Sequence, residues 1–217
     1  MQQAPVRTFH ARAGRLSALT RSRLQDLQAR YAVPPGLLAG PVDDGHGVVL
    51  DVGCGHGAAT LAFAAAYPHR RVVGVDVYPL GIARLLAAVE SAGLTNVYVH
   101  RGDAVTLLGE VAPGRVSAVH LFFPDPWPKA RHRKRRFVSE GTLRLLHRAL
   151  RPQGHVLLAT DRLDYADHVR AQVHAHGGFR VHEVARPPWR PVAGFEAAAL
   201  AAGRAVTDLR LDRVSCG

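Results

Sequence analysis

The sequence has few cysteines, few acidic residues and no long apolar run. Two cysteines, Cys54 and Cys216, are too few for a disulfide framework, so a reducing cytoplasm is the expected location. No signal-like apolar stretch is visible near residue 1, and no segment approaches the roughly 20 apolar residues of a membrane-spanning helix. The 13 histidines are scattered without metal-ligand spacing, so we expect no metal site.

Acidic residues are outnumbered by basic ones. There are 17 Asp and Glu against 28 Lys and Arg, which gives a net charge of +11 and indicates a polyanionic partner such as nucleic acid. A general Arg-rich composition is the alternative. Seven of the eight residues from 129 to 136 are basic, however, and this density favours a localised patch. Apolar residues make up 47% of the 217, enough for one well-packed domain, which we expect to be a monomer.

Apolar segments alternate with helical patterns from residue 48 onward. We predict strands at 48–52, 71–76, 96–103, 116–123, 155–160, 178–185 and 205–214. We predict helices at 15–31, 58–67, 80–92, 139–150 and 165–175, a turn at 151–154 and a loop at 186–204. This alternation predicts an α/β fold with a mostly parallel sheet covered on both faces. No helix is expected between the last two strands, so one of them should be antiparallel. Residues 1–34 are expected to form a basic arm and helix, and residues 35–217 the main domain.

A glycine loop follows the first predicted strand, and acids end three strands in succession. Gly53 and Gly55 allow the backbone to turn tightly beside a ligand. Asp51, Asp76 and Asp103 lie at the ends of the first three strands, which meet at one edge of a parallel sheet. The pattern suits a nucleoside with a cationic amino group: Asp51 near the ammonium, Asp76 on the ribose and Asp103 on the base. The alternative is that these acids are helix caps and turn residues.

This region resembles the Rossmann-like methyltransferases that depend on S-adenosylmethionine. The resemblance implies a seven-stranded sheet with one antiparallel strand and helices on both faces. It also implies a cofactor site formed by Asp51, Gly53, Gly55, Asp76, Val77, Asp103, Ala104 and Asp125.

A second signature follows the fourth predicted strand and reads "FFPDPWPKARHRKRR". It is similar to the signature of the tRNA (guanine-N7)-methyltransferase family, and "LDVGCGHG", "GVDVYPLG", "RGDA", "LRPQGHVLLATD" and "YADHV" occur in that family's order. The resemblance implies methyl transfer from S-adenosylmethionine to a guanosine in the variable loop of tRNA. Guanine N7 carries an in-plane lone pair, so alignment and charge stabilisation matter more than a strong base.

The same resemblance suggests roles for individual residues. Asp125, between two prolines, is expected to position guanine and to stabilise the developing positive charge; a general-base role is possible but is not required. Asp161, matching the aspartate in "ATD", is expected to accept from guanine N1 and N2. Trp127 is expected either to stack or to pack beneath the loop. The other predicted substrate residues are Lys129, Phe195 and Glu196, and the predicted RNA-contacting residues are Arg131, His132, Arg133, Lys134, Arg135 and Arg136.

One segment departs from the family pattern. A Thr-Lys-Phe-Glu segment is expected before the last strand, usually followed by a basic residue, but residues 193–198 read Ala-Gly-Phe-Glu-Ala-Ala. The hydroxyl and both positive charges are missing. Two other functions therefore stay open: a methyltransferase acting on a free nucleobase-like molecule, and an RNA-binding protein without catalytic activity.

Overall fold

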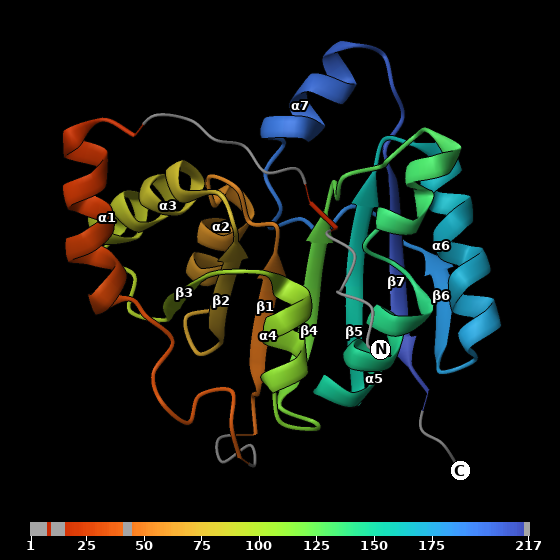
Figure 1. Ribbon diagram of the computed structural model, residues 1–217, viewed down its shortest axis with the longest axis horizontal. Coiled ribbons are helices and arrows are strands. Elements are labelled where there is room, and N and C mark those ends of the chain that lie inside the picture. Colours follow the sequence, from red (N-terminus) through yellow and green to blue (C-terminus); the bar gives the residue numbers. More distant parts are fainter. Residues whose placement is uncertain (1–7, 10–15, 41–44, 215–217) are drawn as a thin grey trace.

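The computed structural model describes residues 8–9, 16–40 and 45–214, so most of the predicted basic arm, and Cys216, lie outside the described residues. A seven-stranded sheet in the order β3-β2-β1-β4-β5-β7-β6 forms the centre of the fold (Figure 1). Only β7 runs antiparallel to its neighbours β5 and β6. The predicted fold class is therefore confirmed. The strands are β1 Val48–Val52, β2 Arg71–Asp76, β3 Val97–Arg101, β4 Val116–Phe122, β5 Leu150–Thr160, β6 Phe179–Glu183 and β7 Thr207–Arg213.

Helices cover both faces of the sheet (Figure 1). One face, which includes Val49 and Ala118, packs against α2 (Ala58–Ala66) and α3 (Pro79–Ala92), and α1 (Ala18–Arg30) packs on α3. The other face, which includes Leu50 and Val119, packs against α4 (Ala104–Glu110), α5 (Glu140–Ala149) and α6 (Leu163–His176). Strands buried on both sides need apolar residues at consecutive positions, which explains the unbroken apolar runs in the sequence.

Two α-helices of the described residues were not predicted. Helix α4 begins directly after Asp103, whose side chain accepts a hydrogen bond from Val105 N, and α7 (Gly194–Ala201) occupies part of the predicted loop at 186–204. Residues 196–201 read Glu-Ala-Ala-Ala-Leu-Ala, all strong helix formers. The loop prediction was wrong there because a helix of eight residues shows too few turns for apolar periodicity to be visible.

The segment at 151–154 belongs to β5 instead of forming a free turn. Val116 of β4 pairs with Leu150 of β5, and Ala118 of β4 pairs with His155 of β5. The chain therefore advances five residues along β5 while it advances two along β4. The extra residues of β5 form a bulge, in which Gln153 has a φ of 64°. The turn signal thus marks an irregularity inside a longer strand.

The start of α5 is stabilised by a capping box. Ser139 Oγ accepts from Thr142 N, and Thr142 Oγ1 accepts from Ser139 N at 3.0 Å. A capping box usually has Glu or Gln at this third position, and here the hydroxyl of Thr142 supplies the acceptor instead.

The described ranges contain no helix long and apolar enough to cross a membrane. Within these same ranges, no group of three or more His, Cys, Asp or Glu side chains is placed to hold a metal ion.

Candidate active site

A cavity of about 700 Å³ lies at the carboxyl ends of β1 to β4. Its walls come from the glycine loop after β1, the segments after β2, β3 and β4, the region around α7, and Thr8 and Phe9. In Figure 1, α7 lies beyond the upper ends of the parallel strands. The structure brings all eight predicted cofactor residues into this lining: Asp51, Gly53, Gly55, Asp76, Val77, Asp103, Ala104 and Asp125.

The glycine loop is held in place by the strand next to it. Gly53 and Gly55 have φ values of 74° and 55°, which L-residues with a Cβ rarely adopt. Gly53 N donates to Val75 O at 2.8 Å, and Gly55 N donates to Asp76 Oδ2 at 2.8 Å. Asp76 Oδ1 also accepts from Tyr78 N at 2.8 Å. Asp76 therefore orders the loop, and further lone pairs on its two oxygens remain for a ligand.

Asp51 is a deeply buried acid of the cavity, with 2% of its surface exposed. Thr60 Oγ1 donates to its carboxylate. Burial raises the pKa of Asp51 to about 6, and the neighbouring charge of Asp76 acts in the same direction. A cation bound in the cavity would stabilise this carboxylate.

Asp103 caps α4, since its Oδ1 accepts from Val105 N at 3.0 Å. The capping role considered from the sequence is thus present. It uses one lone pair and leaves the residue in the cavity lining, so capping and ligand binding are compatible.

The segment that carries Asp125 is anchored by aromatic and backbone contacts. Trp127 is 3% exposed and has a φ of 42°, and Phe123 has a φ of 53°, a conformation that costs a non-glycine residue free energy. Trp127 Nε1 donates to Thr8 O at 3.3 Å. Arg135 Cζ lies 3.8 Å from the centroid of the Trp127 ring. Of the two roles considered, Trp127 takes the packed one, and it fixes the loop beside the cavity.

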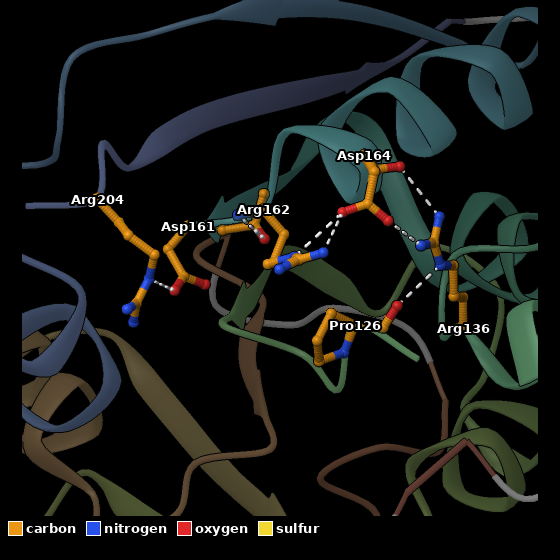
Figure 2. Close-up of polar contacts among 7 residues, drawn as sticks. Pro126, Arg136, Asp161, Arg162, Asp164 and Arg204 are labelled. Atoms are coloured by element: carbon orange, nitrogen blue, oxygen red, sulfur yellow. Dashed lines mark hydrogen bonds and ion pairs between the residues drawn. The ribbon is translucent and has the colours of Figure 1, made fainter. Parts of the chain in front are cut away.

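Arg136 does not lie on the surface, where the RNA-contact prediction placed it. It is 2% exposed, and it donates to Pro126 O at 2.9 Å, Asp164 O at 3.0 Å and Asp164 Oδ2 (Figure 2). This guanidinium joins the Asp125 segment to the start of α6. Because the guanidinium is buried among these acceptors, we assign Arg136 a structural role.

The rest of the basic run forms a 3-10 helix, η1 (Ala130–Arg135). Arg135 also donates to Phe9 O at 3.4 Å, and the His132 ring lies edge-on to Trp127. The exposed cations of the run are Lys129, Arg131, Arg133 and Lys134.

The structure does not bring all predicted substrate residues together. Lys129 and Asp161 are outside the cavity lining, and Asp161 Oδ2 accepts from Arg204 Nε at 2.8 Å (Figure 2). Phe195, 62% exposed, and Glu196, 3% exposed, do line the cavity. The Glu196 carboxylate, however, faces a buried arginine.

That arginine, Arg190, is a residue that the sequence analysis missed. It is 2% exposed, and it donates to both oxygens of Glu196 at 3.1 Å and to Asp208 of β7 at 2.5 and 3.1 Å. Its Cζ lies 4.7 Å from the centroid of Phe122. Arg190 thereby holds α7 against the sheet, and both oxygens of the Glu196 carboxylate accept from this arginine. Three separated residues form this cluster, and no local pattern could have indicated it.

The composition of the cavity fits a nucleoside that carries a cationic group. Carboxylates lie at consecutive strand ends, whereas apolar side chains, including Phe122 and Phe195, supply flat surfaces. This combination of carboxylate acceptors and apolar surfaces therefore agrees with S-adenosylmethionine.

Residues 46–209 match a protein-family model described as "Putative methyltransferase". A tRNA (guanine-N(7)-)-methyltransferase of Nitrosococcus oceani is 36% identical over 218 residues, covering 98% of this chain and 92% of that protein. A protein of the same name from Treponema pallidum is 33% identical over 235 residues, covering 94% of each. Among solved structures, precorrin-6y C5,15-methyltransferase from Geobacter metallireducens has a TM-score of 0.56 at 13% identity, covering 94% of this chain and 93% of that one; this likeness shows the fold alone.

Proposed function

The chain belongs to the tRNA (guanine-N7)-methyltransferase family, and we propose that it transfers a methyl group from S-adenosylmethionine to N7 of a guanosine in tRNA. The observation that carries this proposal is that Asp51, Asp76, Asp103 and Asp125 line one cavity next to a cationic surface segment.

Asp51, Asp76 and Asp103 provide the contacts that hold the cofactor in this proposal. S-adenosylmethionine, when bound, supplies an electrophilic methyl group attached to a sulfonium sulfur. Asp51 pairs with its ammonium, and this pairing offsets the cost of burying the carboxylate. Asp76 accepts from the ribose hydroxyls while keeping its bonds to the loop, and Asp103 lies beside the adenine together with Val77 and Ala104.

Asp125 positions the guanine. N7 needs no deprotonation at neutral pH, so the carboxylate orients the base and stabilises the positive charge that develops on the purine. The prolines on both sides of Asp125 and the buried Trp127 keep this carboxylate at the cavity wall. Asp161 accepts from guanine N1 and N2 through Oδ1, since Oδ2 is bonded to Arg204.

The exposed cations on and before η1 bind the tRNA backbone in this proposal. Lys129, Arg131, Arg133 and Lys134 are exposed next to the Asp125 segment, so phosphate contacts there would place a variable-loop guanosine at the cavity. Arg135 and His132 support the segment through Trp127.

The test is a methyl-transfer assay on unmodified tRNA transcripts and on free guanosine, with 7-methylguanosine detected by mass spectrometry of digested nucleosides. We expect 7-methylguanosine in tRNA only. Methylation of free guanosine alone would identify the small-molecule methyltransferase considered above. Binding of tRNA without turnover would identify the RNA-binding protein without catalytic activity.

A further inference from the structure

A second cavity, of about 350 Å³, lies on the α2 face of the sheet. It is bounded by Phe63 of α2, by Tyr67 directly after that helix, and by side chains from β4, β5 and β7. His120 pairs in register with Leu157, and Leu157 with Arg210, so these three side chains lie on one face of the sheet. The two cavities share no lining residue.

Aromatic rings form one wall of this second cavity. The Trp189 ring lies 5.1 Å from that of Phe63 and 4.9 Å from that of His120, and the Phe63 and Tyr67 centroids are 4.8 Å apart. Val49, Ala118 and Leu157 add apolar surface. Such walls favour a flat, apolar ring system over a compact ion.

The charged side chains in the lining are all cationic. Arg70 and Arg210 line the cavity, and no carboxylate does so among the described residues. Arg210 donates through Nε to Asp212 at 2.8 Å, which leaves its two terminal nitrogens for a ligand. Within the described part of the chain, the Arg70 side chain makes one long hydrogen bond, of 3.4 Å, to His46 O. Burial, together with Arg210 and Arg70, lowers the pKa of His155 to about 4, and it is therefore neutral at pH 7. Among the described residues, no negatively charged side chain therefore lines this cavity.

One buried polar atom in the lining has no partner. His120 is 1% exposed, and its Nδ1 makes no hydrogen bond to any described residue. Buried polar atoms in folded proteins nearly always have partners, since an unpaired one keeps the full cost of desolvation. A ligand with a ring nitrogen or an exocyclic donor would supply this partner.

We propose that this cavity binds a planar aromatic anion of mononucleotide size, with its ring against Trp189 and His120 and its anionic group at Arg70 and Arg210. The volume lies at the lower end of the range for small-molecule sites, which fits one nucleotide. Planar guanidinium groups are suited to holding phosphate. The nucleotide is either free in solution or part of a tRNA, and both sources present the same chemistry.

One pair of stacked rings joins the wall of this cavity to the wall of the active site. The His120 ring stacks on Phe122 with centroids 5.4 Å apart and planes 21° apart, and Phe122 lines the larger cavity. A ligand at His120 therefore contacts the back of the active-site wall.

The experiment measures binding of guanosine 5′-monophosphate to the full chain by isothermal titration calorimetry, and of tRNA by filter binding. We expect Arg70→Ala and Arg210→Ala each to weaken binding by about tenfold to a hundredfold, the effect of losing a charged hydrogen bond. The matched control is Arg144→Ala, which removes an exposed arginine from α5 on the opposite face and should change binding less than twofold. Because Arg70 and Arg210 are partly exposed, both variants should fold, and circular dichroism checks this.

Weakened binding of guanosine 5′-monophosphate in both cavity variants, but not in the control, supports the site with a free nucleotide as ligand. Weakened tRNA binding in those variants, without binding of the free nucleotide, supports the site with a tRNA nucleotide as ligand. If neither affinity distinguishes Arg70→Ala and Arg210→Ala from Arg144→Ala, the proposal is wrong.

Discussion

Replacing Glu196 by Gln tests whether its carboxylate stabilises α7 or contacts a substrate. The side chain is 3% exposed, and its two oxygens accept from Arg190 at 3.1 Å. Glutamine keeps one acceptor but turns its amide nitrogen, a donor, toward a guanidinium that also donates. Breaking a buried ion pair costs about 3–5 kcal/mol, and a charged hydrogen bond contributes about 1.5–3 kcal/mol. Because Arg190 keeps Asp208, we expect the free energy of unfolding to fall by about 2–3 kcal/mol.

Thermal unfolding followed by circular dichroism measures this change. For a chain of this length, a loss of 2–3 kcal/mol lowers Tm by roughly 4–12 °C. The control is Glu183→Gln, since Glu183 is a 65% exposed carboxylate that pairs with Arg170 at 3.0 Å and should contribute less than about 1 kcal/mol. If Glu196→Gln melts like the control but loses methyl transfer at 25 °C, the carboxylate acts on the substrate and our assignment is wrong.

Four further predictions concern the active site and the cationic segment. Because burial raises the pKa of Asp51 from 3.8 to about 6, the free energy of unfolding should fall by about 3 kcal/mol as pH rises through that interval. Asp51→Asn should remove this pH-dependent loss, which urea unfolding at pH 4 and pH 7 measures. Asp125→Ala should lower kcat by about a hundredfold to a thousandfold with Tm nearly unchanged; an unaffected kcat would remove Asp125 from the reaction. The double variant Arg131→Ala/Arg133→Ala should reduce the salt dependence of tRNA binding by about two units of slope. By contrast, Arg136→Ala should lower Tm by several degrees, because it removes a buried guanidinium that donates to Asp164 and to Pro126 O. If Arg136→Ala reduced the salt dependence of tRNA binding as much as the double variant does, without a fall in Tm, the structural role of Arg136 would be contradicted.

Local patterns were sufficient to predict the sheet and most of the active-site edge. Strands buried on both faces need uninterrupted apolar runs, and a residue that follows a parallel strand must lie at the carboxyl edge of the sheet. Asp51, Asp76 and Asp103 therefore came together as predicted from their positions at or near the ends of three strands. The glycine loop was likewise visible, because its positive φ values exclude most other residues.

The sequence by itself determined which residues lie at the edge of the sheet, but only the tertiary structure decided which of their charges are still available to a ligand. Arg136 and Arg135 are adjacent in one basic run, yet the first is buried against Asp164 and the second lies over Trp127. Glu196 pairs with Arg190, and Arg190 in turn with Asp208 of β7, residues that become neighbours only when α7 packs on the sheet. The physical reason is that a charge is free or paired according to burial and to partners distant along the chain, and neither is encoded in the spacing of nearby residues.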